Sequence, residues 1–192
     1  MMSKDTLDTL SKTELWERFP IRLVPHDPWW KTVYAQEKAL ITNEVPEVMI
    51  KRIEHIGSTA VEGIHAKPTI DILLEIEEVQ AFDAFTDPLE RAGYIRTGKG
   101  EKRWFFRKGY TMEGYAERVV HLHLRKPGDN DELYFRDYLL EHPEVAKAYE
   151  ALKRALKDNH EKNRDDYTDG KTDFIMQYTI IAKAQYASRY DE

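Results

Sequence analysis

Hydrophobic and polar residues alternate with a two-residue period in three short stretches, residues 69–76, 102–108 and 117–125, which predicts three β-strands. Each strand has one aliphatic or aromatic side and one side that carries polar groups, because successive side chains of a strand point to opposite faces. The polar sides consist of Asp71, Leu73 and Glu75 in the first strand, Arg103, Phe105 and Arg107 in the second, and His121, His123 and Arg125 in the third. A further apolar stretch, residues 50–56, predicts a fourth strand.

Apolar residues recur with helical spacing elsewhere in the chain. We expect helices at 11–19, from 28 up to Pro46, at 79–94, 132–142 and 143–159, and near 172–187. Residues 109–116 are expected to be the loop of a hairpin, and 160–171 a polar link. We therefore predict an α+β fold, a mixed sheet with helices on one face and a C-terminal helical extension. Within a single domain, we expect an N-terminal extension with a short helix (1–20), an α/β core (21–130) and a helical part packed on it (131–192).

Composition limits the function classes. The net charge of the 192 residues is −6, which argues against nucleic-acid binding driven by bulk charge. The chain has no cysteine, which excludes disulfides and thiolate chemistry. No stretch approaches the roughly 20 apolar residues of a membrane span, and the first residues are too polar for a signal peptide. We expect a cytoplasmic protein with neither a membrane nor a nucleic acid as partner.

The polar sides of the three strands suggest a binding surface. If the strands are neighbours, carboxylates, imidazoles and guanidinium groups gather on one face. Carboxylates suit a hard cation and arginines suit phosphate oxygens, so together they suit a metal-bound nucleotide. A half-exposed antiparallel sheet would show the same alternation, and the His-x-His spacing of His121 and His123 also fits half of a zinc site. The pattern leaves these alternatives open.

A Gly-Ser pair, Gly57-Ser58, precedes the strand that carries Asp71. Glycine lets the backbone approach a ligand closely, and a serine hydroxyl with the first N–H groups of a helix can hold phosphate. Lys67 and Lys171 are further candidates for phosphate binding, although an unplaced lysine is more often a surface residue. His55 either lines the site or is a satisfied sheet residue.

The order of these motifs resembles the nucleotidyltransferase superfamily, and more specifically the GrpB family (UPF0157) within it. The matching stretches are LVPHDPWWKTVYAQEKALI, EHIGSTAVEGIHAKPTIDILLEI, RWFFRK, HLHLR and YTDGKTDFI, between residues 23 and 175. The resemblance implies a nucleotide site at the Gly-Ser turn and two divalent cations, Mg²⁺ or Mn²⁺, held by carboxylates on two neighbouring strands.

The sequence departs from that pattern where the acids should lie. Asp71 fills the first acidic position, but Leu73 stands at the second, and His121 and His123 stand where another acid is expected. We predict Asp71 and Glu75 as catalytic residues and Asp71, His121 and His123 as metal ligands. The predicted phosphate-binding residues are Gly57, Ser58, Lys67, Arg103, Arg107 and Lys171.

The sequence is compatible with three functions. The first is a metal-dependent nucleotidyltransferase that acts on a small molecule. The second is a nucleotide- or coenzyme-binding protein without transfer chemistry, for which the resemblance implies a link to coenzyme A metabolism. The third is a metal-dependent phosphohydrolase that uses the two histidines.

Overall fold

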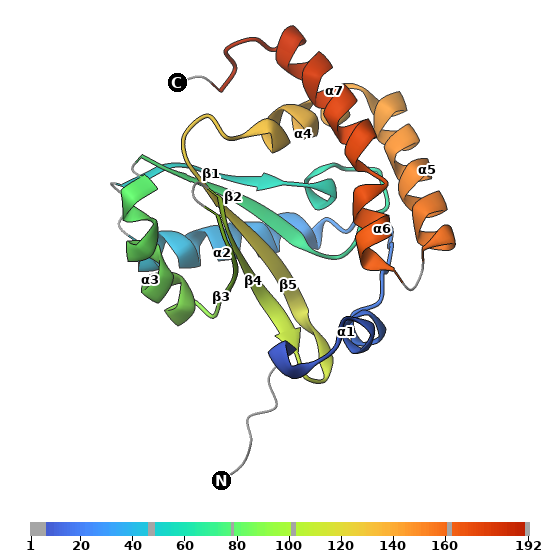
Figure 1. Cartoon of the computed structure of the whole chain (residues 1–192). Coiled ribbons are helices and arrows are strands. Elements are labelled where there is room, and N and C mark those ends of the chain that lie inside the picture. The colour runs from blue at the N-terminus through green and yellow to red at the C-terminus, as the bar shows by residue number, and fades with distance from the viewer. Residues whose placement is uncertain (1–6, 46–48, 78, 101–102, 161–162, 191–192) are drawn as a thin grey trace.

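A five-stranded mixed sheet forms the centre of the computed structural model, which describes residues 7–45, 49–77, 79–100, 103–160 and 163–190 (Figure 1). The strands are β1 (Ile50–Ile56), β2 (Ile70–Ile76), β3 (Ile95–Lys99), β4 (Arg103–Thr111) and β5 (Gly114–Arg125). Their order in the sheet is β1-β2-β5-β4-β3. Only the central pair, β2 and β5, is parallel; the other neighbours are antiparallel.

Helices cover both sides of this sheet to different extents (Figure 1). They are η1 (Leu7–Thr9), α1 (Lys12–Arg18), α2 (Trp29–Glu44), η3 (Ser58–Ala60), η4 (Val79–Phe85), α3 (Thr86–Arg91), α4 (Asp131–Glu141), α5 (Pro143–Asn159), α6 (Arg164–Asp169) and α7 (Thr172–Gln185). No helix of the described residues is long and apolar enough to span a membrane.

The aliphatic sides of the strands make the main core. Ile70, Ile72 and Leu74 of β2 pack with Val120, Leu122 and Leu124 of β5 against residues of α2 and α3. The C-terminal helices and the 58–64 connector share a second core, rich in tyrosine and phenylalanine. That second layer meets the sheet where Leu133 of α4 packs on Ile56 and Leu73. The rest of the polar side of the sheet lines a cleft.

Most of the predicted elements are confirmed. The strands at 50–56 and 70–76 and the helices at 12–18, 131–141, 143–159 and 172–185 lie within two residues of their expected ends. The helix at 12–18 begins with a capping box formed by Ser11 and Glu14. The end of the helix at Pro46 and the start of the strand at residue 102 lie outside the described residues. The domain boundaries stay a prediction.

Three elements differ from the prediction. Residues 109–116 are not a loop, because β4 and β5 extend through them to a tight turn. The edge strand β3 was missed, since its alternation is short and interrupted by Gly98. The polar link contains α6, whose N-cap is Asn163: its side chain accepts hydrogen bonds from the backbone N–H groups of Asp165 and Asp166.

Candidate functional site

Asp71, His121 and His123 lie together on one face of the sheet. The parallel register of β2 and β5 places Asp71 directly beside His121. Oδ1 of Asp71 lies 3.2 Å from Nδ1 of His121 and 3.5 Å from Nε2 of His123. Phe105 of β4 packs its ring edge-on against both imidazoles, with centroid distances of 5.1 Å. The predicted grouping of an acid and two imidazoles on one surface is therefore present.

The protonation pattern of these groups follows from their partners. Arg125 can only donate, so Nδ1 of His123, 3.1 Å from Nη2 of Arg125, accepts, and Nε2 of His123 donates to Asp71. Burial raises the pKa of Asp71, but the hydrogen bonds that it accepts from His121 and His123 lower it more. The pKa of Asp71 therefore falls well below its usual range, and the carboxylate stays ionised.

Gly57 is required by the position of Asp71. Its φ is +73°, in the region that favours glycine. A Cβ atom on Gly57 would lie only 2.6 Å from Oδ2 of Asp71. The turn between β1 and η3 therefore packs its bare backbone against the carboxylate.

Tyr110 is an additional member of the cluster. Its hydroxyl lies 2.8 Å from Nε2 of His121. Since Nδ1 of His121 faces a carboxylate and carries the hydrogen, Nε2 accepts from the tyrosine. Tyr110 and Arg107 line the same cavity although they are three residues apart on β4, a spacing that strict alternation would place on opposite faces.

The cause is a shift in the pairing of β4 and β5 between Lys108 and Tyr110. Gly109 lies at this point with φ +87°, and a Cβ there would lie 1.9 Å from the carbonyl oxygen of Arg118. Irregularities of this kind turn side chains toward functional sites. Here the shift at Gly109 brings Tyr110 to His121.

Cationic side chains surround Asp71. Burial lowers the pKa of Lys67 to about 8; the charges of Arg164 and Lys171 lower it as well, and that of Asp71 raises it. Burial also lowers the pKa of Lys171, against the effect of Asp71. Both ammonium groups lie over the ring of Tyr167, at 5.9 and 4.5 Å from its centroid.

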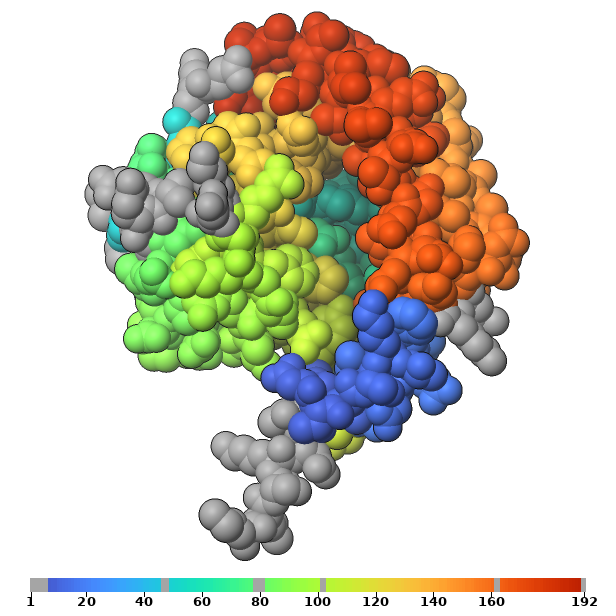
Figure 2. All heavy atoms as spheres, viewed as in Figure 1, coloured from blue at the N-terminus to red at the C-terminus, as the bar shows by residue number. Residues whose placement is uncertain are grey.

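Arg107 contributes an unpaired donor. Its Nε is buried without a hydrogen-bond partner, and it lies beside His121 in the register of β4 and β5. Arg107, Tyr110, His121 and Arg164 share a cavity of about 300 Å³ with residues of α1. Figure 2 shows this face of the molecule hollowed between the blue α1, the yellow-green β4–β5 hairpin and the orange-red α6.

The structure separates other predicted site residues from this cluster. Glu75 is fully buried: Oε2 lies 2.8 Å from Nη1 of Arg52, and Oε1 accepts from the backbone of Gly128 and from Asn130. These contacts occupy both oxygens, so its predicted catalytic role has no geometric support. Arg103 lies at the opposite end of β4, with an exposed side chain paired to Asp129.

Ser58 keeps its place at the turn, but its side chain has a partner within the protein. Its hydroxyl forms a hydrogen bond with Tyr149 of α5, which opposes the rise in the pKa of Tyr149 that burial causes. The Gly-Ser turn is thus tied to the C-terminal helices. Ser58 as a phosphate ligand stays a prediction.

The three predicted metal ligands do not have the geometry of a metal centre. A metal ion binds the lone pair of a neutral imidazole nitrogen. The lone pairs of His121 and His123 face Tyr110 and Arg125 instead, and their N–H groups face Asp71. Leu73, buried against Ile56 and Leu133, supplies no second carboxylate beside Asp71. In the described part of the chain, no three His, Cys, Asp or Glu residues are arranged to hold a metal ion.

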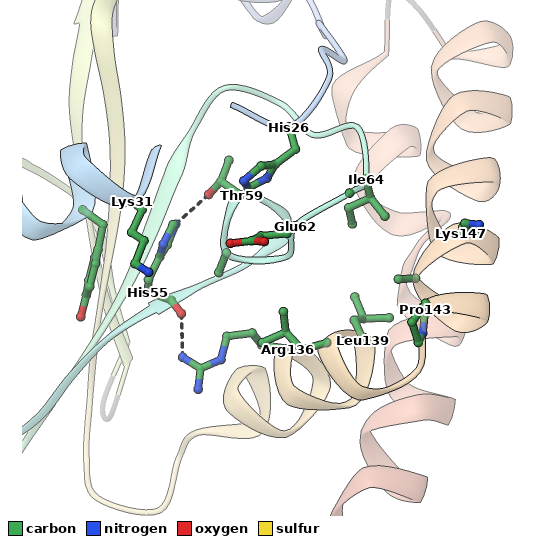
Figure 3. A pocket seen from close by; sticks show the side chains of 15 residues that line it. His26, Lys31, His55, Thr59, Glu62, Ile64, Arg136, Leu139, Pro143 and Lys147 are labelled. Atoms are coloured by element: carbon green, nitrogen blue, oxygen red, sulfur yellow. Dashed lines mark hydrogen bonds between the residues drawn. The ribbon is translucent and has the colours of Figure 1, made fainter. Parts of the chain in front are cut away.

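A second, larger cavity of about 560 Å³ is lined by the 59–64 connector together with residues of α2, α4 and α5 (Figure 3). His55 lines it: Nε2 is 2.9 Å from Oγ1 of Thr59, and its ring stacks on Tyr34. Burial lowers the pKa of His55 to about 4, so the ring is neutral near pH 7. Arg136 reaches the same place and donates to the carbonyl oxygen of His55. This cavity lacks the acid–imidazole cluster.

Sequence reasoning missed Tyr110, Arg164 and Tyr149. Tyr110 was assigned to a loop, and only the glycine before it signalled a break in alternation. Arg164 lay in the supposed polar link, where the sole signal was Asn163 as an N-cap. Tyr149 lay within the expected helix at 143–159, without a sign that its hydroxyl reaches Ser58.

Comparison with known proteins gives the family. The family model described as GrpB protein matches residues 20–180. The chain is 32% identical over 178 residues to the UPF0157 protein YqkA of Bacillus subtilis, which covers 91% of this chain and 50% of YqkA. The chain thus spans half the length of that curated relative.

Solved structures agree. The crystal structure of the conserved protein GrpB from Enterococcus faecalis matches with a TM-score of 0.75 and 31% identity, over 86% of this chain and 99% of that one. The Cid1 poly(U) polymerase with MgGTP bound matches with a TM-score of 0.50 and 9% identity, over 71% of this chain and 44% of that one, a likeness of fold alone. The chain belongs to the GrpB family, and its fold resembles that of a nucleotidyltransferase domain.

Proposed function

We infer that the chain binds a nucleoside triphosphate over Asp71 and transfers its nucleotidyl group to a small acceptor. The observation that carries this proposal is the excess of positive charge in the cleft. The charge of Asp71 acts on Lys67 and Lys171, while Arg107 and Arg164 lie beside Tyr110. None of these four cations forms an ion pair with another described residue.

Crowded cations without counter-ions favour a polyanion. The depressed pKa values of Lys67 and Lys171 mean that their charged forms are destabilised in the empty cleft. An anion with several charges relieves this cost, and guanidinium groups match phosphate oxygens in geometry. The unpartnered Nε of Arg107 supplies a donor for the same ligand. The likeness of fold to a nucleotide-bound polymerase favours a nucleotide over other polyphosphates.

The protein's own cations take over much of the charge neutralisation in this proposal. The described acid and imidazole side chains are not arranged as a cation site, so no step is assigned to a cation. Triphosphate binding is therefore expected to persist in EDTA. A requirement for Mg²⁺ or Mn²⁺ in binding would contradict this assignment.

The test is equilibrium binding of ATP, GTP, CTP and UTP by calorimetry. Loss of one charge-assisted contact weakens binding by about tenfold or more, so Arg107→Ala is expected to have at least this effect. Arg103→Ala is the matched control, because Arg103 lies on the same strand but pairs with Asp129 at the far end. Equal effects of the two substitutions, or no binding by the wild-type chain, would refute the proposal.

Transfer is tested separately, with α-labelled triphosphate and a pool of small metabolites. Turnover is expected to be lost in Asp71→Asn, a substitution that keeps the size of the side chain but removes its charge. Turnover unchanged by Asp71→Asn would refute the role of the carboxylate.

A second function, binding without transfer, is favoured because the cleft lacks the further acids expected of a transferase. Position 73 is a buried leucine, and the carboxylate of Glu75 is held by structural contacts. Coenzyme A, which carries phosphates and an adenine nucleotide, is the additional ligand to test. Tight binding of a nucleotide or of coenzyme A, together with the absence of any transfer product, would select this alternative.

A further inference from the structure

Tyr110, His121 and Asp71 form a continuous hydrogen-bonded chain. The tyrosine hydroxyl is 2.8 Å from Nε2 of His121, and Nδ1 of the same ring is 3.2 Å from Oδ1 of Asp71. A hydroxyl, an imidazole and a carboxylate in this order are the arrangement in which a histidine activates a nucleophile and an acid orients the histidine.

The environment of the hydroxyl suits an attack on phosphorus. Tyr110 lines the cavity together with Arg107 and Arg164. Arg164 also hydrogen-bonds to the tyrosine, and the guanidinium carbon of Arg107 lies 5.1 Å from its ring centroid. Burial raises the pKa of Tyr110, and the charges of the two arginines oppose this rise. The hydroxyl therefore keeps its proton until a base removes it.

Tyr110 is distinguished from neighbouring tyrosines by its base. Among the tyrosines in the described ranges, it is the one whose hydroxyl contacts an imidazole nitrogen. The hydroxyl of Tyr115, its partner across the hairpin, points to the carbonyl oxygen of Phe19 at 3.1 Å. Tyr149 bonds to Ser58.

We propose that Tyr110 is a nucleophile that accepts a nucleotidyl group from the bound triphosphate, so that the chain modifies itself at this residue. This inference rests on the proposed function. It adds the atom that attacks and a modification site.

The chemistry balances without a further reactant. The phenolic oxygen forms a bond to the α-phosphorus, and the bond from that phosphorus to the bridging oxygen of pyrophosphate breaks. The proton of Tyr110 passes to Nε2 of His121, and Asp71 stabilises the resulting imidazolium. Pyrophosphate leaves with the electron pair of the broken bond, next to Arg107 and Arg164. The products are a tyrosyl nucleotide, pyrophosphate and one proton.

The experiment uses the full chain with α-labelled triphosphates. One readout is label that stays on the denatured protein, located by mass spectrometry of its peptides. The other is exchange of labelled pyrophosphate into triphosphate, which also detects a short-lived adduct. Triphosphate binding is measured in parallel for every variant.

The wild-type chain is expected to give a label at Tyr110, pyrophosphate exchange, or both. Tyr110→Phe is expected to lose both signals and still bind triphosphate, and Tyr115→Phe, the matched control, is expected to keep them. Because a general base contributes about a hundredfold or more, His121→Asn is expected to slow the signal by at least this factor with binding nearly unchanged.

Each other outcome is decisive. Binding without label or exchange in the wild-type chain would overturn the role of Tyr110 but leave the proposed binding function intact. Signals that persist in Tyr110→Phe would do the same. Absence of triphosphate binding in the wild-type chain would instead refute the proposed function, and this inference with it.

Discussion

Gly57 leaves no room for a side chain beside Asp71, because a Cβ atom would lie 2.6 Å from Oδ2 of the carboxylate. Gly63, in the same connector, also has a positive φ, of +82°, but no atom lies within 4 Å of its hypothetical Cβ. The two glycines thus share a backbone requirement and differ in the contact.

We predict that Gly57→Ala and Gly63→Ala each lower the free energy of unfolding by roughly 1–3 kcal/mol, because both force a side chain into a strained backbone conformation. Gly57→Ala alone is expected to displace Asp71 and shift the NMR signals of the His121 and His123 rings. Thermal unfolding and histidine NMR measure these effects. Identical histidine spectra in the two variants would show that Gly57 does not constrain the carboxylate.

Glu75 is predicted to stabilise the fold and to take no part in the site. Glu75→Gln leaves Arg52 without its buried partner, which we expect to cost roughly 3 kcal/mol of unfolding free energy. Triphosphate affinity of the folded variant should stay unchanged. Glu77→Gln, at an exposed position of the same sequence segment, is the control and should change stability by less than about 0.5 kcal/mol. A stable Glu75→Gln variant that has lost turnover would return Glu75 to the catalytic residues.

Leu73→Asp would supply the second acid that a two-cation centre needs, but at a position with no exposed surface. The new carboxylate would lie against Ile56 and Leu133, and we expect a loss of about 3 kcal/mol or more in unfolding free energy. Leu73→Met, which keeps the volume, should cost less than about 1.5 kcal/mol. Denaturant titration distinguishes them. A Leu73→Asp variant as stable as Leu73→Met would mean that the position tolerates an acid.

Triphosphate affinity is predicted to fall as the pH rises through about 8, where Lys67 loses its proton in the unliganded protein. The sign follows from linkage: the anion binds the protonated lysine, so binding becomes weaker wherever the free protein releases that proton. Calorimetric titrations from pH 7 to 10 measure this fall. Lys67→Met should bind more weakly at pH 7 and lack this step. A constant wild-type affinity over the whole interval would place Lys67 outside the binding site.

The face of the sheet that holds the site was predictable from alternation alone. Asp71, His121 and Arg107 share that face because each lies on the polar side of its own alternating strand. The strand register then aligns them across three strands. The alternation does not, however, identify the partner of each side chain. Glu75 lies on the same side of its strand as Asp71, yet its carboxylate is held by Arg52 and Asn130, which no local pattern in the sequence links to it.

Residues that enter the site through irregular geometry were not predictable. Strict alternation would place Tyr110 on the face opposite the site, and only the shifted register at Gly109 brings it to the site face. Arg164 belongs to a helix of 6 residues with few apolar positions, so no hydrophobic periodicity predicts this helix. The regular elements were therefore found, and the residues that complete the site were not.

The hydrogen atom in place of a side chain at position 109 has a consequence for comparing this protein with others. An alanine there would collide with the carbonyl oxygen of Arg118, and relief of that collision requires the hairpin to pair differently. The aliphatic core beneath would keep its composition, while the hydroxyl of Tyr110 would move away from the ring of His121. Homologues that keep the tyrosine but lack this glycine should therefore fold alike and differ in chemistry, which makes position 109 the first to inspect when activity is sought among relatives.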